Sequence, residues 1–435
     1  MTEARQSIRV GLLGCGTVGG GVIRLIERNR ESITARVGAP VEVAHVLVRD
    51  ASRERVSECK PEWVTTDPEV VFGDDSVDVY VEVMGGEEPA KSYVERAMSL
   101  GRGVVSANKY LLALHGPALL QKAADNNVDL AFEASVGGGI PVIRTLREAL
   151  TSDSVDSVHA ILNGTCNYIL TRMRNEGIAF EPILKDAQNL GYAEAEPSLD
   201  VDGHDAAQKL VVLSMLAFGA SVNVEDVHVE GIRDVDDIDF AFAERFGLTI
   251  KHLAIGHERG DKIELRVHPA LISKESVLGN VNDVLNGAYI QGRALGPCLI
   301  VGRGAGEMPT AVSVVSDLVD VARGKISGRP GLATKVIRPV PRALVPMSEV
   351  ETKYYLRFEV ADESGVLGMI TGALGDEGVS ISQVMQEGRG ANGESVPVLI
   401  ITHPAAQGAI DRALAKISQS GSMKKAPRLI RIEDL

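Results

Sequence analysis

Short runs of hydrophobic residues alternate with helix-like stretches along roughly the first 110 residues of the chain. Four of these runs predict buried strands, at Ile8 to Leu13, Val41 to Val48, Val77 to Met84 and Val104 to Ser106. Strands that alternate with helices are typical of a parallel sheet with helices on both faces. The pattern therefore predicts an α/β domain with a doubly wound parallel sheet over residues 1–145.

The hydrophobic pattern changes near Leu146. An amphipathic stretch at Asp205 to Phe218 predicts a helix, and the alternation at Lys262 to His268 predicts a strand. These mixed features predict a second domain of the α+β class over residues 146–303.

Prolines interrupt the chain before its C-terminal region. They stand at positions 330, 339, 341 and 346 among glycine and basic residues, a composition that breaks helices and favours an extended linker. We expect residues 304–325 to complete the first domain, residues 326–352 to form a linker, and a third domain to cover residues 353–435.

The C-terminal region has the order strand, helix, strand, strand, helix. The predicted elements are strands at Tyr354 to Val360, Val379 to Glu387 and Val396 to Ile401, and helices at Val366 to Gly375 and Ala405 to Ser418. This order predicts a small ferredoxin-like module.

The composition is that of a soluble globular protein. Of 435 residues, 45% are hydrophobic and 24% are charged, and 59 acidic against 45 basic residues give a net charge of −14. Because this charge repels phosphate groups, we expect no nucleic-acid partner and no membrane partner. Four scattered cysteines, together with a start that lacks a signal-peptide layout, predict a cytoplasmic protein.

A glycine-rich hexapeptide directly follows the first predicted strand. It reads Gly14-Cys15-Gly16-Thr17-Val18-Gly19 and opens an apolar-periodic helix, which is the setting that a dinucleotide-binding Rossmann motif requires. Gly14 permits the tight turn, Gly16 lets backbone N–H groups approach a pyrophosphate, and Gly19 allows close helix packing. The alternative is a glycine turn without a ligand, but the strand and helix around the motif favour cofactor binding, with Thr17 and Val18 at the helix start.

Residues after the neighbouring strands extend the predicted cofactor site. Arg49, at the end of the second strand, would accommodate a 2′-phosphate and slightly favours NADP, whereas the adjacent Asp50 keeps NAD open. Gly85, Ser106 and Lys109 stand at the carboxyl ends of the next two strands, where ligands bind in doubly wound sheets.

A second lysine stands near an acidic stretch. Lys209 follows Asp205 by one helical turn, and five of the twelve residues from Glu194 to Asp205 are acidic. Such a pair is usually solvated, and the acids could bind an ammonium group, a divalent ion or nothing. The pattern alone does not assign Lys209 a catalytic role.

Six segments in sequence order resemble the homoserine dehydrogenase family, and the resemblance covers essentially the whole chain. These segments are Gly11–Gly19, Ala107–Lys109, Phe132–Pro141, Ile161–Leu170, Gly191–Pro197 and Asp200–Lys209. The resemblance implies a dinucleotide-binding domain joined to a catalytic and dimerising domain. It also implies the reversible, NADP- or NAD-dependent reduction of L-aspartate 4-semialdehyde to L-homoserine.

The resemblance implies a role for individual residues of this chain. Lys209 matches the lysine that transfers a proton at the substrate oxygen, and Lys109 matches the lysine near the nicotinamide and the substrate. The matching substrate residues are Glu194 and Asp205, which would hold the substrate ammonium, together with Thr165, Tyr192 and Asp200.

Two further sites rest on the same resemblance. A loop would bind a monovalent cation, sodium or potassium, through oxygen ligands; the matching residues are Glu133, Val136, Gly138 and Ile140. A late glycine turn at Gly304 and Gly306 would return to the cofactor.

The segment Phe358 to Ile370 resembles an ACT regulatory module. Asp362 and Gly365 match its strand-to-helix turn, where helix N-terminal amides can bind the carboxylate of an amino-acid effector. Threonine is the expected effector, from the pathway that the family serves. The alternative is a module that forms a dimer without binding a ligand.

Two other functions compete with a regulated homoserine dehydrogenase. One is an amino-acid sensor in which the dehydrogenase part is only a scaffold, and the complete set of Lys109, Lys209, Glu194 and Asp205 argues against it. The other is an oxidoreductase for a different aldehyde, and the paired acids argue for a substrate that carries an amine. A homo-oligomer, dimer or tetramer, is expected from the family only.

Overall fold

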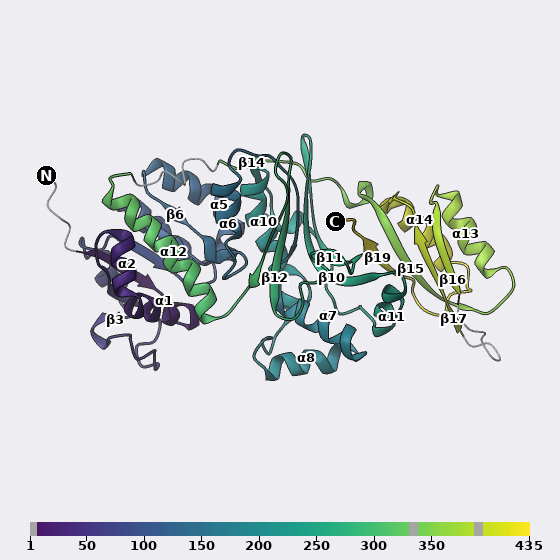
Figure 1. Cartoon of the computed structure of the whole chain (residues 1–435), viewed down its shortest axis with the longest axis horizontal. Helices are drawn as coiled ribbons and strands as arrows, with labels where there is room; N and C mark the ends of the chain where they lie inside the picture. Colours follow the sequence, from purple (N-terminus) through teal and green to yellow (C-terminus); the bar gives the residue numbers. More distant parts are fainter. Residues whose placement is uncertain (1–6, 330–337, 387–394) are drawn as a thin grey trace.

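The computed structural model describes residues 7–329, 338–386 and 395–435, and it places three regions side by side along one long axis (Figure 1). The N-terminal region lies at one end, a large sheet lies in the middle, and the C-terminal region lies at the other end. Residues 330–337 of the predicted linker, and Glu387 at the end of a predicted strand, fall outside the described residues.

The N-terminal region contains a six-stranded parallel sheet with the order β3-β2-β1-β4-β5-β6. Its strands are β1 (Ile8–Leu13), β2 (Val41–Leu47), β3 (Val64–Thr65), β4 (Val79–Glu82), β5 (Gly103–Ser106) and β6 (Leu130–Ala131). This is the Rossmann order, and the direction of winding reverses between β1 and β4. The four predicted strands are confirmed, whereas β3 and β6 were missed because two residues carry no periodic pattern.

Helices cover both faces of this sheet. On one face lie α1 (Thr17–Arg28), α2 (Arg30–Val37) and α12 (Glu307–Ile326), and on the other lie α3 (Pro68–Phe72), α4 (Ala90–Ser99) and α5 (Lys109–Asp125). In Figure 1 the green helix α12 lies among the purple and blue elements. A Cβ on Gly21 of α1 would lie only 3.0 Å from the Cβ of Ala311 of α12, so glycine permits this close packing.

The second sheet is mixed and has eleven strands, nine of which follow the order β13-β12-β7-β10-β11-β19-β15-β17-β16. Its central strands are β7 (Val155–Ile161), β10 (Leu248–Arg259), β11 (Lys262–Ser273), β12 (Leu285–Gly292) and β13 (Gly296–Arg303). The C-terminal region adds β15 (Glu351–Ala361), β16 (Ile381–Gln386), β17 (Ser395–Thr402) and β19 (Arg428–Ile432). The short strands β9 (His228–Val229) and β18 (Ala405–Ala406) pair with β11 and β15.

Helix α10 (His204–Ala217) connects the first two regions. Its apolar side chains share one buried cluster with α5 of the N-terminal region and with the central strands of the second sheet. The predicted helix at Asp205 to Phe218 is therefore confirmed. The other elements around it are α6 (Val142–Arg144), α7 (Gly164–Glu176), α8 (Phe180–Asn189), α9 (Ser198–Val201) and α11 (Asp237–Arg245).

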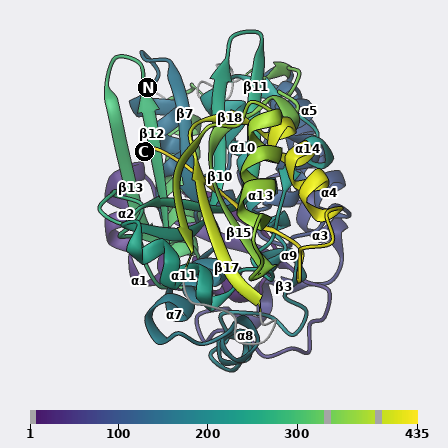
Figure 2. The same ribbon diagram turned by 90° about the vertical axis from the view of Figure 1, so that its right-hand side faces the viewer.

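The C-terminal region has the order β15, α13 (Val366–Asp376), β16, β17, α14 (Gln407–Ser418), β19. Helices α13 and α14 pack beside each other over one face of its strands (Figure 2). This is the β-α-β-β-α-β order of a ferredoxin-like fold. The last strand, β19, was missing from the sequence prediction.

Strand β19 joins the C-terminal region to the middle of the molecule. It pairs in parallel with β11, through Ala270 and Leu271, and in antiparallel fashion with β15. The described part of the predicted linker is docked as well, because β14 (Val340–Pro341) pairs with β8 (Ala220–Ser221) and Arg342 binds Glu258. The C-terminal region is thus part of a continuous sheet.

A search of the described residues for membrane-spanning helices gave no candidate of sufficient length and hydrophobicity.

Candidate active site

The glycine motif forms a turn between β1 and α1, at the point where the parallel sheet reverses its winding. Gly14 adopts φ +99°, and its N–H donates to the carbonyl of Leu47 at 2.9 Å. A Cβ on Gly19 would lie 2.5 Å from the Gly14 carbonyl oxygen, whereas a Cβ on Gly16 would meet nothing within 4 Å. Gly19 therefore serves packing, and Gly16 faces open space that a pyrophosphate can fill.

Replacing Gly16 by alanine should weaken cofactor binding without weakening the fold. The added methyl group finds free space in the protein, but it occupies the position that a pyrophosphate needs. We expect KM for NAD or NADP to rise about 10- to 100-fold, which corresponds to about 1–3 kcal/mol of overpacking. Steady-state kinetics and a melting curve check this result. Gly19→Ala is the comparison, and it should lower Tm as well.

A buried carboxylate organises the loops beside this turn. Glu82, at the end of β4, is 0% exposed and accepts a hydrogen bond from the Ser106 hydroxyl at 2.6 Å. It also accepts from the backbone N–H groups of Met84 at 2.8 Å and Gly85 at 3.3 Å. Burial raises the pKa of Glu82 above its ordinary range. Sequence reasoning missed this residue, although an acid within an apolar strand was a visible signal.

Asn108 connects the same loops to the start of α5. Its amide donates to the Gly86 carbonyl at 2.7 Å, and its side-chain oxygen accepts from the Leu111 N–H at 3.1 Å, which caps the helix. Because Lys109 is the first residue of α5, the cap formed by Asn108 fixes the position of the Lys109 backbone.

The residues predicted to read the ribose lie in an exposed loop after β2. Arg49 and Asp50 are both exposed, and the Asp50 carboxylate accepts hydrogen bonds from Ser52, at 2.9 Å from the backbone nitrogen and 2.6 Å from the hydroxyl. Nearby, burial and the adjacent Cys59 raise the pKa of the Cys15 thiol to about 11. Cys15 is therefore a neutral thiol at ordinary pH.

Two lysines from different regions meet at one carboxylate. Lys109 comes from α5 of the N-terminal region, and its Nζ lies 3.1 Å from Oδ1 of Asp205. Lys209 comes from α10, and its Nζ lies 2.6 Å from Oδ2 of the same aspartate and 2.7 Å from the Leu162 carbonyl oxygen. The structure thus brings Lys109 to a pair, Asp205 and Lys209, that lies about 100 positions later in the sequence. It also shows that Asp205 and Lys209 are not an exposed pair, since their side chains are 6% and 12% accessible.

Asp205 is held in place and kept ionised by its surroundings. Burial alone would raise its pKa, but Lys209, Lys109 and a hydrogen bond from Asn163 lower it to about 2. The Asn163 amide donates to Asp205 at 2.9 Å and to Asp200 at 2.7 Å. Burial and the Asp205 charge raise the pKa of Asp200. Sequence reasoning missed Asn163, which also caps α7 through the Cys166 N–H.

Among the other predicted substrate residues, Thr165 lies at the start of α7, and Tyr192 and Glu194 lie on the exposed segment after α8. The Thr165 hydroxyl donates to the Tyr192 carbonyl at 2.6 Å, and the Tyr192 ring packs edge-on against Tyr168. The backbone of Glu194 accepts a hydrogen bond from Gln188, but no contact within the described residues joins its exposed carboxylate to Asp205. The structure therefore brings Asp200 and Asp205 together and leaves Glu194 apart from them.

The predicted cation loop is buried against the late glycine turn. Glu133 is 3% exposed, and its two oxygens accept from the Ile143 N–H at 2.9 Å and the Arg144 N–H at 2.7 Å. Burial and the neighbouring Asp317 raise the pKa of Glu133 to about 7.

The glycines of this loop fit tightly together. Val136 and Ile140 are buried, and a Cβ on Gly138 would lie 2.3 Å from the Gly304 carbonyl oxygen. Gly306 precedes α12 with φ +114°. The two predicted glycine segments therefore lie in contact.

The predicted effector turn lies at the far end of the molecule. Gly365 has φ +94° and directly precedes α13, and Asp362 lies just after β15. This turn is remote in the chain from the lysine pair, so an effector bound there would act through the continuous sheet.

Comparisons with known proteins agree with this arrangement. A family model described as "Homoserine dehydrogenase, NAD binding domain" matches residues 14–133, and one described as "Homoserine dehydrogenase" matches residues 141–319. The homoserine dehydrogenase of Bacillus subtilis is 39% identical over 429 residues, which cover 98% of this chain and 99% of that protein.

Solved structures of homoserine dehydrogenases are also similar to this chain. A homoserine dehydrogenase from Thiobacillus denitrificans is 40% identical and superposes with a TM-score of 0.92 over 99% of both chains. A hyperthermophilic archaeal homoserine dehydrogenase in complex with NADPH is 26% identical, with a TM-score of 0.62 over 73% of this chain and 98% of that chain.

Proposed function

This chain belongs to the homoserine dehydrogenase family of NAD(P)-dependent oxidoreductases, and from that premise we propose how its residues carry out the reaction. The substrate pair is L-aspartate 4-semialdehyde and L-homoserine. The observation that carries the proposal is the convergence of Lys109 and Lys209 on the single buried carboxylate of Asp205.

Lys209 is the residue that exchanges a proton with the substrate oxygen. A lysine ammonium has three N–H donors, and the Asp205 carboxylate and the Leu162 carbonyl accept two of them. One donor is left for the carbonyl oxygen of the semialdehyde. The bound nicotinamide supplies the hydride for reduction and accepts it for oxidation.

The substrate ammonium is the part that the acids recognise. Asp200 and Asp205 lie together through Asn163, so a cationic group that enters here gains two carboxylates as partners. We assign Thr165 and Tyr192 to the rim of the same pocket, and Glu194 to a part of the pocket that bound substrate would complete. Lys109 orients the substrate beside the nicotinamide.

The turn formed by Gly14, Gly16 and Gly19, with Thr17 and Val18 at the helix start, would hold the pyrophosphate of the nicotinamide cofactor. Exposed Arg49 supports a preference for NADP, because a guanidinium can bind a 2′-phosphate bidentately. Gly85 and Ser106, in the loops that Glu82 holds, would contact the nicotinamide part of the cofactor, and Gly304 and Gly306 would contribute a second glycine turn to the cofactor site.

A monovalent cation binds at the loop of Glu133, Val136, Gly138 and Ile140. Sodium or potassium at about five times its Kd should stabilise the protein by about 1 kcal/mol, relative to a choline salt of equal ionic strength. Glu133→Gln should remove the difference, because the ligand charge is lost. Melting curves check this, with exposed Glu148→Gln as the matched control. If Glu133→Gln kept the same difference in Tm between the two salts as the wild type, the cation would bind elsewhere.

Residues 353–435 act as an ACT regulatory domain that binds threonine at the turn of Asp362 and Gly365. The β-α-β-β-α-β order and the start of α13 at this turn support the proposal. The coupling to the active site runs through β19, which pairs with both β15 and β11.

The protein works in the cytoplasm as a homo-oligomer, a dimer or tetramer. Edge strand β13 supports self-association, since its side chains Leu299 and Val301 are 40% and 42% exposed on one face. The domains we assign are 1–145 with 304–325 for the cofactor, 146–303 for the substrate, and 353–435 for regulation, with residues 326–352 between them.

One set of rate measurements tests this function. Purified protein is given L-homoserine with NAD or with NADP, each with and without threonine, and nicotinamide reduction is followed by absorbance. Faster turnover with NADP supports the role of Arg49, and Arg49→Ala should remove that preference. Rates that do not change over a wide threonine range would remove the regulatory part, and no turnover with either cofactor would remove the whole assignment.

A further inference from the structure

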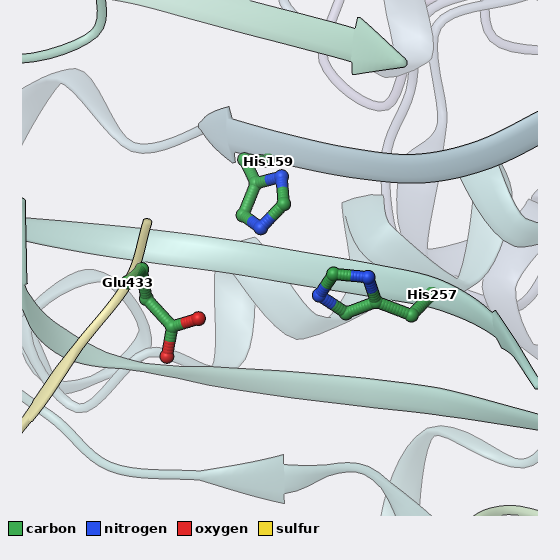
Figure 3. A group of neighbouring side chains, drawn as sticks. All are labelled: His159, His257 and Glu433. Atoms are coloured by element: carbon green, nitrogen blue, oxygen red, sulfur yellow. The ribbon is translucent and has the colours of Figure 1, made fainter. Parts of the chain in front are cut away.

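Three potential metal ligands meet within the second sheet, away from the lysine pair. His159 lies on β7, His257 lies on the adjacent strand β10, and Glu433 directly follows β19. One ligand atom from each lies within 4.8 Å of the others. Figure 3 shows the two imidazole rings and the carboxylate pointing into one shared space.

One histidine lacks a hydrogen bond that buried polar groups normally form. His159 is 4% exposed, and its Nδ1 is buried without a partner. The neighbouring His257 is half-buried, and the two rings pack edge to face with centroids 5.0 Å apart. Because a polar atom is costly to bury unpaired, the Nδ1 of His159 requires an explanation.

Both rings are also in the form that binds metals. Burial lowers the pKa of His257 to about 4 and lowers that of His159 well below its ordinary value. The imidazoles are therefore neutral at ordinary pH, so a metal ion does not have to displace a proton from either ring.

Glu433 is oriented by Arg266 and keeps room for a metal ion. Its two oxygens accept from the Arg266 guanidinium at 2.6 and 3.0 Å, and Arg266 also donates to Glu264 at 2.8 Å. A carboxylate offers about four lone-pair sites, so about two remain. Such outer partners commonly hold ligating carboxylates in position. Glu264 also pairs with half-exposed Arg259, whose nitrogens lie 3.0 and 3.1 Å from one of its oxygens, so Arg266 is not the sole cation that balances Glu264 and Glu433.

We propose that His159, His257 and Glu433 bind a divalent first-row transition metal ion, zinc in the first instance. Two imidazoles and one carboxylate suit zinc, cobalt or nickel rather than magnesium or calcium. Tetrahedral zinc with bonds of about 2.0–2.1 Å places its ligand atoms about 3.3 Å apart, so the three side chains, whose ligand atoms now lie within 4.8 Å, would move closer together on binding. The fourth position takes water.

The bound ion would link the segment after β19 to strands β7 and β10 of the second sheet. Glu433 belongs to the C-terminal segment, whereas His159 lies three residues before Leu162, whose carbonyl accepts the Lys209 amine. The site therefore links the C-terminal strand to the strand that leads into the active site.

Metal binding to the full-length protein tests the proposal. Protein treated with a chelator is titrated with Zn²⁺ by calorimetry, and bound metal is counted by mass spectrometry. We expect one ion per chain and a rise in Tm of about 5 °C at about 100 times Kd. His257→Gln should lower the affinity at least about 100-fold. His45→Gln is the matched control, since His45 pairs with Asp74 at the distant β2 and should leave binding unchanged.

Cobalt binding to the wild-type protein provides a second test that does not require a variant to fold. Wild-type protein with one Co²⁺ should show the intense visible bands of four-coordinate cobalt and X-ray absorption from two imidazole ligands. Octahedral cobalt without imidazole, or zinc binding that survives in His257→Gln, would overturn the site. Because none of these measurements uses substrate or cofactor, their outcome does not depend on the proposed function.

Discussion

Replacing Lys209 by alanine is expected to lower kcat for homoserine oxidation by about 10²- to 10⁴-fold, the usual contribution of a positioned acid or base. The side chain is 12% accessible, and two of its three N–H donors are bound by Asp205 and the Leu162 carbonyl. Its remaining donor is therefore directed by fixed partners. KM for the cofactor should change little, because Lys209 lies on α10 and not on the glycine turn.

The comparison that decides the role is Lys109→Ala. Lys109 is more accessible, at 31%, and Asp205, at 3.1 Å, is its one ion-pair partner among the described residues, so its loss should affect KM for homoserine more than kcat. Pre-steady-state and steady-state rates with both variants separate these effects. A kcat within a few-fold of wild type for Lys209→Ala, together with complete loss in Lys109→Ala, would exchange the two roles. Lys185→Ala, on exposed helix α8, is the control for a general loss of positive charge.

Sequence reasoning works best here where a local pattern has one physical cause. The strand-glycine-helix segment at Ile8 to Gly19 predicted both the parallel sheet and the turn, because only this order places a helix N-terminus at the end of a strand. The helix at His204 to Ala217 was equally clear from its periodicity. Each of these predictions needed no information from elsewhere in the chain.

Features that depend on contacts between residues far apart in the sequence could not be predicted from local patterns. Strand β19 is only five residues long, and its place between β11 and β15 follows from contacts with residues some 70 to 160 positions away. Glu82 and Asn163 support the site through buried hydrogen bonds, which no spacing in the sequence reveals. The family resemblance placed Glu194 in the substrate pocket, but within the described residues its exposed carboxylate has no contact with Asp205.

Replacing Asp205 by asparagine should damage both stability and activity, whereas Lys209→Ala should mainly lower kcat. The aspartate is 4% exposed and is the shared anion of two ammonium groups. Removing one partner from a buried charge cluster commonly costs about 3–5 kcal/mol. We expect a lower Tm, a large rise in KM for homoserine and a kcat/KM reduced at least about 100-fold, since the substrate ammonium also loses a carboxylate.

The effect on stability should depend on pH in a defined direction. The pKa of Asp205 is lowered to about 2 from an ordinary value of 3.8, so its ionised form stabilises the folded protein. This contribution is fully present above about pH 4 and is lost as pH falls through about 2, and it amounts to about 2 kcal/mol. The difference in unfolding free energy between wild type and Asp205→Asn should therefore shrink over that interval.

The neighbouring Asp202→Asn is the control for this prediction. Asp202 is partly exposed and pairs with Arg233, so its loss should cost no more than about 1 kcal/mol and leave KM for homoserine unchanged. Denaturant titrations at several pH values, combined with initial rates, measure both effects. If Asp205→Asn matched Asp202→Asn in stability and in KM, the shared carboxylate would not be what holds the two lysines and the substrate together.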